Sequence, residues 1–202
     1  MRRVILVLAV LASALAWAGA AGAAERYRLD KPHTQILFAV SHLGLSTSYG
    51  KFMDYDGGFT LDRGNLSRSK VDVTVHMASV DMGDRAWDDA VKGRDFFDVA
   101  QYPDMRFVST GVRRTGDNAA VVTGNLTLRG VTRPVTLDVT LNKTGRHPFM
   151  DKYMAGFSAA GVLRRSDFGM GHGVPFVGDE VKLILEVEGE RVDQPGQGTY
   201  NQ

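Results

Sequence analysis

Apolar and polar residues alternate with a period of two along much of the chain after residue 24. Such alternation is typical of β-strands that have one buried face and one wet face. The clearest example places Ile36, Phe38, Val40 and His42 on a single face. Five further strands of this kind are predicted, at residues 71–77, 122–128, 135–141, 155–161 and 181–187. Two weaker candidates, at residues 51–61 and 105–112, bring the predicted number of strands to eight.

Short turns separate these strands, which indicates an antiparallel sheet. Turn-forming residues occur at positions 62–65, 115–118 and 177–179. One segment alone predicts a helix: Asp84 can cap residues 85–92, and Gly93 can end them. The aromatic-rich segment that follows, residues 94–103, is expected to form a lid or plug between two strands.

The length of the strands favours a barrel, although alternation alone also fits a β-sandwich. Runs of about ten residues span roughly 33 Å, and strands of five or six residues are more usual. A closed barrel of eight strands has no exposed edges, and its interior can hold one small ligand. We therefore predict an all-β fold, an eight-stranded antiparallel barrel with one short helix or lid.

The first residues predict a secretory signal peptide. Two arginines precede an apolar run over residues 4–18, and small residues follow over residues 19–24. The run is shorter than the roughly 20 residues that a permanent membrane helix needs, which disfavours an uncleaved anchor. We expect residues 1–24 to be a cleaved signal peptide, residues 25–193 to be a single barrel domain, and residues 194–202 to be a disordered tail.

Charge and cysteine content narrow the class of protein. The predicted signal holds two of the 24 basic residues and none of the 23 acidic ones, so 22 basic and 23 acidic side chains remain. A net charge this close to zero gives no reason to expect nucleic acid as a partner. The chain has no Cys, so an exported form has no disulfide and cannot use thiolate chemistry. The bacterial periplasm is the predicted location.

The five histidines do not form a local metal motif. None is spaced two residues from another on a strand or four on a helix, although distant strands can still assemble a site. His42 shares its face with apolar residues, so it is either a hydrogen-bonded core residue or a contact for a polar ligand group. The sequence also lacks Gly-x-Ser-x-Gly and Gly-x-x-x-x-Gly-Lys-Ser/Thr. We predict that the protein is not an enzyme and uses no cofactor.

Nearly all of the chain after residue 24 resembles the YceI family. The resemblance begins in the first strands, with Tyr27-x-Leu29-Asp30-x-x-His33-x-x-Ile36-x-Phe38-x-Val40-x-His42, Gly50-x-Phe52 and Gly58-x-x-Leu61. It continues through Arg94-Asp95-Phe96-Phe97-Asp98-Val99-x-x-Tyr102-Pro103-x-Met105-x-Phe107 and Gly124-x-Leu126-Thr127-Leu128-x-Gly130-Val131-Thr132-x-Pro134-Val135. Arg165-Ser166-Asp167-Phe168-Gly169-Met170 and Val177-Gly178-Asp179-x-Val181 complete it. Residues 87–92 depart from the Arg-Asp-x-x-Leu pattern of the family.

The resemblance implies a lipocalin-like barrel in the periplasm that carries or sequesters a polyprenyl, quinone or similar long-chain amphiphile. It also implies a lining for the interior, made by Phe38, Val40, His42, Phe52, Met77, Phe97, Phe107, Leu126, Leu137, Phe157 and Phe168. Arg94 and Arg165 are predicted to contact an anionic head group.

Two other functions remain open from the sequence: a stress or interaction module with a packed barrel and no lipid, and a periplasmic esterase. The protein is expected to be a monomer or a homodimer, without a permanent membrane span after cleavage.

Overall fold

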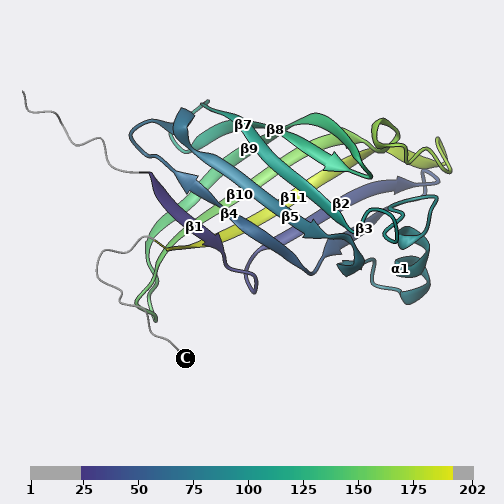
Figure 1. Cartoon of the computed structure of the whole chain (residues 1–202), viewed down its shortest axis with the longest axis horizontal. Helices are drawn as coiled ribbons and strands as arrows, with labels where there is room; N and C mark the ends of the chain where they lie inside the picture. The colour runs from purple at the N-terminus through teal and green to yellow at the C-terminus, as the bar shows by residue number, and fades with distance from the viewer. Residues whose placement is uncertain (1–23, 193–202) are drawn as a thin grey trace, which may run out of the picture.

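The computed structural model describes residues 24–192, which form one tilted-strand barrel with a short helix at one end (Figure 1). Its strands are β1 (Glu25–Leu29), β2 (Gln35–His42), β3 (Ser46–Phe52), β4 (Tyr55–Leu61), β5 (Lys70–His76), β6 (Val80–Asp81), β7 (Asp104–Arg114), β8 (Ala119–Leu128), β9 (Val131–Arg146), β10 (Tyr153–Arg164) and β11 (Val177–Arg191). The helix is α1 (Arg85–Lys92), and single 3-10 turns lie at Leu66–Arg68, Met77–Ser79 and Arg165–Phe168.

The sheet closes because β1 pairs with both β4 and β11. The long strand β11 pairs with β1 near its end, at Tyr27 and Arg191, and with β2 further back, at Phe38 and Leu183. Strands β1 and β2 therefore share one position in the barrel, and β3 and β4 share another. The result is a closed antiparallel barrel with eight strand positions, which confirms the predicted fold.

The boundaries of two predicted elements were wrong. The weak candidate at residues 51–61 is two strands, because the chain turns at Met53 and Asp54, whose backbone groups bond to Ser79 and His76. The turn predicted at residues 177–179 belongs to β11, where the register opposite β2 is irregular between Val177 and Val181. Strand β1 was not predicted, since five residues give too short an alternation to recognise.

Helix α1 has the limits that the sequence predicted. The Asp84 carboxylate accepts hydrogen bonds from the backbone N–H groups of Ala86 and Trp87, at 2.9 and 3.1 Å. The Gly93 N–H donates to the Ala90 carbonyl at 3.1 Å, which ends the helix. The segment after the helix is fastened to the barrel by Arg129, which donates to the carbonyls of Arg94 and Gly169. The helix and this segment lie together at one end of the barrel (Figure 1).

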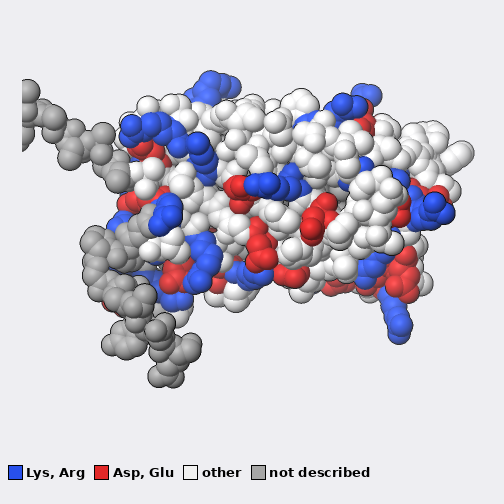
Figure 2. Space-filling model, viewed as in Figure 1, with Lys and Arg blue, Asp and Glu red and all other residues white. Residues whose placement is uncertain are grey.

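Lys, Arg, Asp and Glu side chains are spread over the outside of the barrel on the face drawn in Figure 2. The Arg106 guanidinium forms a two-pronged ion pair with Asp72 across neighbouring strands, and this pair lowers the pKa of Asp72. His76 bonds to Asp104 at 2.7 Å and to Asp56 at 3.1 Å, and these two carboxylates raise its pKa.

Within residues 24–192, no helix is both long enough and apolar enough to cross a membrane. The predicted signal peptide, apart from Ala24, and the predicted tail lie outside the described residues.

Candidate ligand-binding cavity

The interior of the barrel holds a cavity of about 390 Å³, here called the main cavity. Its walls are formed by the inward faces of the strands, and they include Phe59, Phe107, Leu126, Leu137, Phe157 and Ala159. Alternation places them inside, because every second side chain of a barrel strand points inward. The walls are therefore almost wholly apolar.

A second cavity, of about 270 Å³, lies at the end of the barrel that carries α1 and is here called the helix-end cavity. Strands β2 and β3 contribute Phe38, His42 and Phe52, and the helix contributes Trp87. Three residues, Met105, Leu163 and Leu183, line both cavities. The two spaces therefore adjoin at these three side chains.

Glycines in the barrel wall help to keep its axis open. A Cβ atom added at Gly50 would lie 2.3 Å from the ring of Phe38, and one added at Gly124 would lie 2.3 Å from the ring of Phe107. Each ring thus lies against the bare backbone of the neighbouring strand. A ring held along the wall fills less of the interior than one that extends across it, so the barrel remains hollow despite its many aromatic residues.

His42 faces the helix-end cavity. Its ring lies 5.5 Å from the ring of Trp87 between centroids. Among the described residues, none forms a hydrogen bond with the His42 side chain. Of the two readings that the sequence left open, the structure therefore does not support a hydrogen-bonded core histidine. The imidazole nitrogens are available to a polar group at this end of the cavity.

Arg165 also lines the helix-end cavity, but its guanidinium is engaged by the protein. Its side chain donates hydrogen bonds to the carbonyl oxygens of Gly178 and Val177, both at 2.8 Å, and of Met170. The residue is only 4% exposed, and this burial lowers the pKa of its guanidinium. The nearby carboxylate of Asp179 acts in the opposite direction and raises that pKa. Arg165 stays charged, and it joins the 3-10 turn at Arg165–Phe168 to the start of β11.

The structure brings ten of the thirteen predicted site residues to the two cavities. Those at the helix-end cavity are Phe38, Val40, His42, Phe52, Phe97 and Arg165, and those at the main cavity are Phe107, Leu126, Leu137 and Phe157. Met77 and Phe168 belong to the packed core instead. Arg94 is exposed and meets neither cavity.

The predicted set omitted several lining residues. Leu183 and Leu185 on β11 had a signal in the sequence, because they continue the inward alternation. Trp87 had only a weak one, since an aromatic residue on a short amphipathic helix does not show which part of the barrel it meets. Its place over the helix-end cavity depends on the packing of α1.

The two mouths of the barrel differ in polarity. At the end away from α1, the main cavity is bordered by Arg63, Lys70, Arg114 and Asp117. At the α1 end, His42 and Arg165 are the titratable residues that line the helix-end cavity within the described part of the chain.

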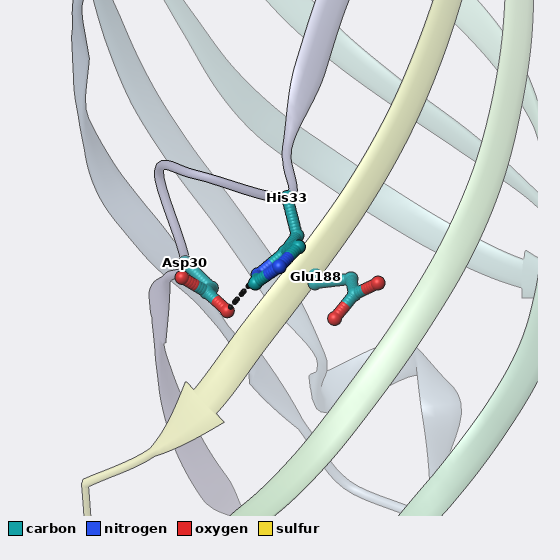
Figure 3. A group of neighbouring side chains, drawn as sticks. All are labelled: Asp30, His33 and Glu188. Atoms are coloured by element: carbon teal, nitrogen blue, oxygen red, sulfur yellow. Dashed lines mark hydrogen bonds and ion pairs between the residues drawn. The ribbon is translucent and has the colours of Figure 1, made fainter.

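A different group of polar residues lies outside the barrel, where β11 meets the turn between β1 and β2 (Figure 3). One imidazole nitrogen of His33 and one carboxylate oxygen each of Asp30 and Glu188, atoms of the kind that bind metal ions, all lie within 4.8 Å of one another. The His33 Nδ1 atom already bonds to Asp30 at 2.9 Å, and this carboxylate raises the pKa of His33. Thr34 exchanges hydrogen bonds with the backbone of Glu188. The contacts in this group fasten the break between β1 and β2 to β11.

Comparison with known proteins gives consistent matches over most of the chain. Residues 27–189 match the model of the YceI-like domain. A UPF0312 protein of Serratia proteamaculans is 41% identical over 187 residues, which cover 92% of this chain and 96% of that protein. Protein YceI of Salmonella arizonae is 43% identical over 181 residues, covering 89% of this chain and 93% of that protein.

Solved structures show the same architecture. The crystal structure of Burkholderia cenocepacia BcnA aligns with a TM-score of 0.72 at 27% identity, covering 79% of this chain and 98% of that chain. A Campylobacter jejuni YceI protein aligns with a TM-score of 0.68 at 30% identity, covering 74% and 88%. A polyisoprenoid binding domain from Saccharophagus degradans has a TM-score of 0.61 at 16% identity, covering 83% and 99%, a likeness of fold alone.

Proposed function

Because this chain belongs to the YceI family of β-barrel proteins, we propose that it binds a long-chain isoprenoid-type lipid, such as a polyprenyl or quinone lipid, inside its barrel. We propose further that it acts as a binding or carrier protein rather than as an enzyme, and that it works in the periplasm. The observation that carries the proposal is the pair of adjoining apolar cavities, of about 390 and 270 Å³.

The energetics of such a lining suit a prenyl chain. Burial of one methylene contributes about 0.8 kcal/mol, so a five-carbon unit contributes roughly 3 to 4 kcal/mol before the costs of ordering are subtracted. Three such units contribute roughly 10 kcal/mol, which leaves room for tight binding after those costs. Affinity then depends on the length of chain buried, and a few polar contacts select the head group.

Two further points support parts of the proposal. The fold is compatible with the cargo, since the Saccharophagus degradans domain of the same fold is described as polyisoprenoid binding. For the periplasm, the support is the sequence of residues 1–24, in which basic, apolar and small residues follow one another as in a secretory signal.

The test is to purify the protein from a bacterial periplasm and weigh it by mass spectrometry under native and then denaturing conditions. An organic extract of the same sample identifies any small molecule that is released. We expect one long-chain isoprenoid or quinone for each protein chain.

Two results together would refute the proposal. They are a native mass equal to that of the bare polypeptide, and a thermal midpoint that does not change when polyprenols or quinones are added. A ligand that binds the folded state at a hundred times its Kd would add about 2.7 kcal/mol of stability, which the melting curve would reveal.

A further inference from the structure

Two loops at the α1 end of the barrel expose large apolar side chains side by side. The first is the turn between β2 and β3, and the second leads into β11. They are joined by a hydrogen bond from the Leu43 N–H to the Phe176 carbonyl, at 2.7 Å. Leu45 is 83% exposed, Phe176 is 70% exposed and Leu43 is 51% exposed. These three residues are called the apolar tip.

The two segments that form the apolar tip carry no acidic, lysine or arginine side chain of their own. Residues 41–50 and 168–178 contain no Asp, Glu, Lys or Arg. Charged side chains reach the second segment further from the tip: Arg129 bonds to the Gly169 carbonyl, and Asp95 lies 3.9 Å from His172. Figure 2 shows an uncharged surface at the upper right extremity of the molecule, where Figure 1 draws the loop that leads into β11. Elsewhere on this face, basic and acidic side chains are interspersed. The tip therefore combines projecting apolar groups with a local lack of charge, which is unusual for a surface that faces only water.

The tip adjoins the mouth of the helix-end cavity. His42 and Val177 line that cavity. In the chain, His42 directly precedes Leu43, and Val177 directly follows Phe176. The opposite mouth of the barrel is bordered by Arg63, Lys70 and Arg114. An apolar molecule that enters past the tip meets Arg165, whose guanidinium is already bonded to three carbonyl oxygens, whereas one that enters from the other end passes the three basic side chains there.

We propose that the apolar tip inserts into the surface of a lipid bilayer, so that lipid passes between the bilayer and the helix-end cavity. This inference rests on the proposed lipid-binding function and adds where the cargo is exchanged. The partner is a bilayer because the tip is small and convex. A stable protein interface buries about 800 Å² on each partner and needs complementary shape, whereas insertion into a bilayer needs only apolar side chains that project.

The experiment measures binding of the full protein to vesicles of phosphatidylcholine, which carry no net charge, by co-sedimentation. The test variant is Leu45→Ser combined with Phe176→Ser. The matched control is Phe149→Ser, because Phe149 is 90% exposed in the turn between β9 and β10, beside the ion pair of Arg146 and Asp151. We expect the double variant to bind vesicles at least tenfold more weakly than wild type and the control to bind as wild type does.

A second measurement separates docking from cargo binding. Transfer of a polyprenol out of vesicles is expected to slow by at least tenfold in the double variant, while its affinity for farnesol added directly from ethanol stays at the wild-type value. If the protein bound vesicles but bound neither polyprenol nor farnesol, the inference that the tip inserts into a bilayer would stand and the lipid-carrying function would be refuted. The inference about the tip would be overturned if wild type did not sediment with vesicles, or if the double variant sedimented equally well. It would also be overturned if the double substitution converted a dimer to a monomer, since the tip would then be a contact between two copies of the chain.

Discussion

Replacing Ala159 with tryptophan is expected to block the main cavity without harming the fold. Ala159 lies on β10 with its methyl group in the cavity wall, opposite the pairing positions Val139 and Leu185. The new side chain adds about nine non-hydrogen atoms, roughly the size of two five-carbon units of a prenyl chain. If it displaces even one unit, the lost burial is roughly 3 to 4 kcal/mol, which corresponds to about a hundredfold to a thousandfold weaker binding.

Stability is expected to respond differently from affinity. The added ring occupies a space of about 390 Å³ rather than a packed core, so the free energy of unfolding without ligand should stay within about 1 kcal/mol of wild type or rise. The assay is a titration with polyprenols of increasing length, together with urea unfolding. The control is Ala160→Trp, because Ala160 is the exposed neighbour on the same strand. Unchanged polyprenol affinity in Ala159→Trp, with stability preserved, would show that the main cavity does not hold the chain.

Asp56 and Asp104 raise the pKa of His76 in the folded state. The ion pairs of His76 therefore stabilise the fold fully below the unfolded-state pKa of about 6.5, and this stabilisation is lost as the pH rises through the higher folded-state pKa. The difference in thermal midpoint between wild type and His76→Gln should therefore shrink as pH rises from about 6 to 9, and a constant difference would contradict this. Arg165→Met leaves three carbonyl oxygens without their donor and should lower the free energy of unfolding in urea by roughly 3 kcal/mol or more, whereas Arg94→Met at an exposed position should not. An Arg165→Met protein of wild-type stability that no longer bound anionic prenyl lipids would instead make Arg165 a head-group contact. Gly124→Ala should cost about 1 to 3 kcal/mol in the same assay, because its Cβ would collide with the ring of Phe107, and a neutral effect would mean that the ring is free to move into the cavity.

The sequence was sufficient to predict most of the wall of the barrel. Alternation over six segments placed Phe38, Leu126 and Leu137 on the apolar faces of their strands, and in the structure these faces point inward. It also predicted α1, because the Asp84 cap and the terminal Gly93 act within a few residues of the helix. These features depend on local backbone geometry and on the period of two along a strand, which a single sequence displays.

The inward face, however, does not show whether a residue meets empty space or another side chain. The family resemblance implied that Met77 lines the cavity, and alternation extended a strand to it, yet it lies in a 3-10 turn, 1% exposed, within the packed core. Arg165 and Arg94 are alike as basic residues in the sequence, but one is buried against three carbonyl oxygens and the other is exposed. Whether each of these side chains is buried depends on which distant segments of the chain pack against it.

The sequence by itself therefore determined most of the strands, the helix and the apolar side of each predicted strand, because those follow from contacts between near neighbours in the chain. The tertiary structure alone decided that the barrel is hollow, that its two cavities adjoin at Met105, Leu163 and Leu183, and which charged side chains border each mouth. The physical reason is that a cavity and its openings are set by the shapes of side chains from many strands at once. The alternation of residues along one strand carries no information about how side chains from different strands pack against one another.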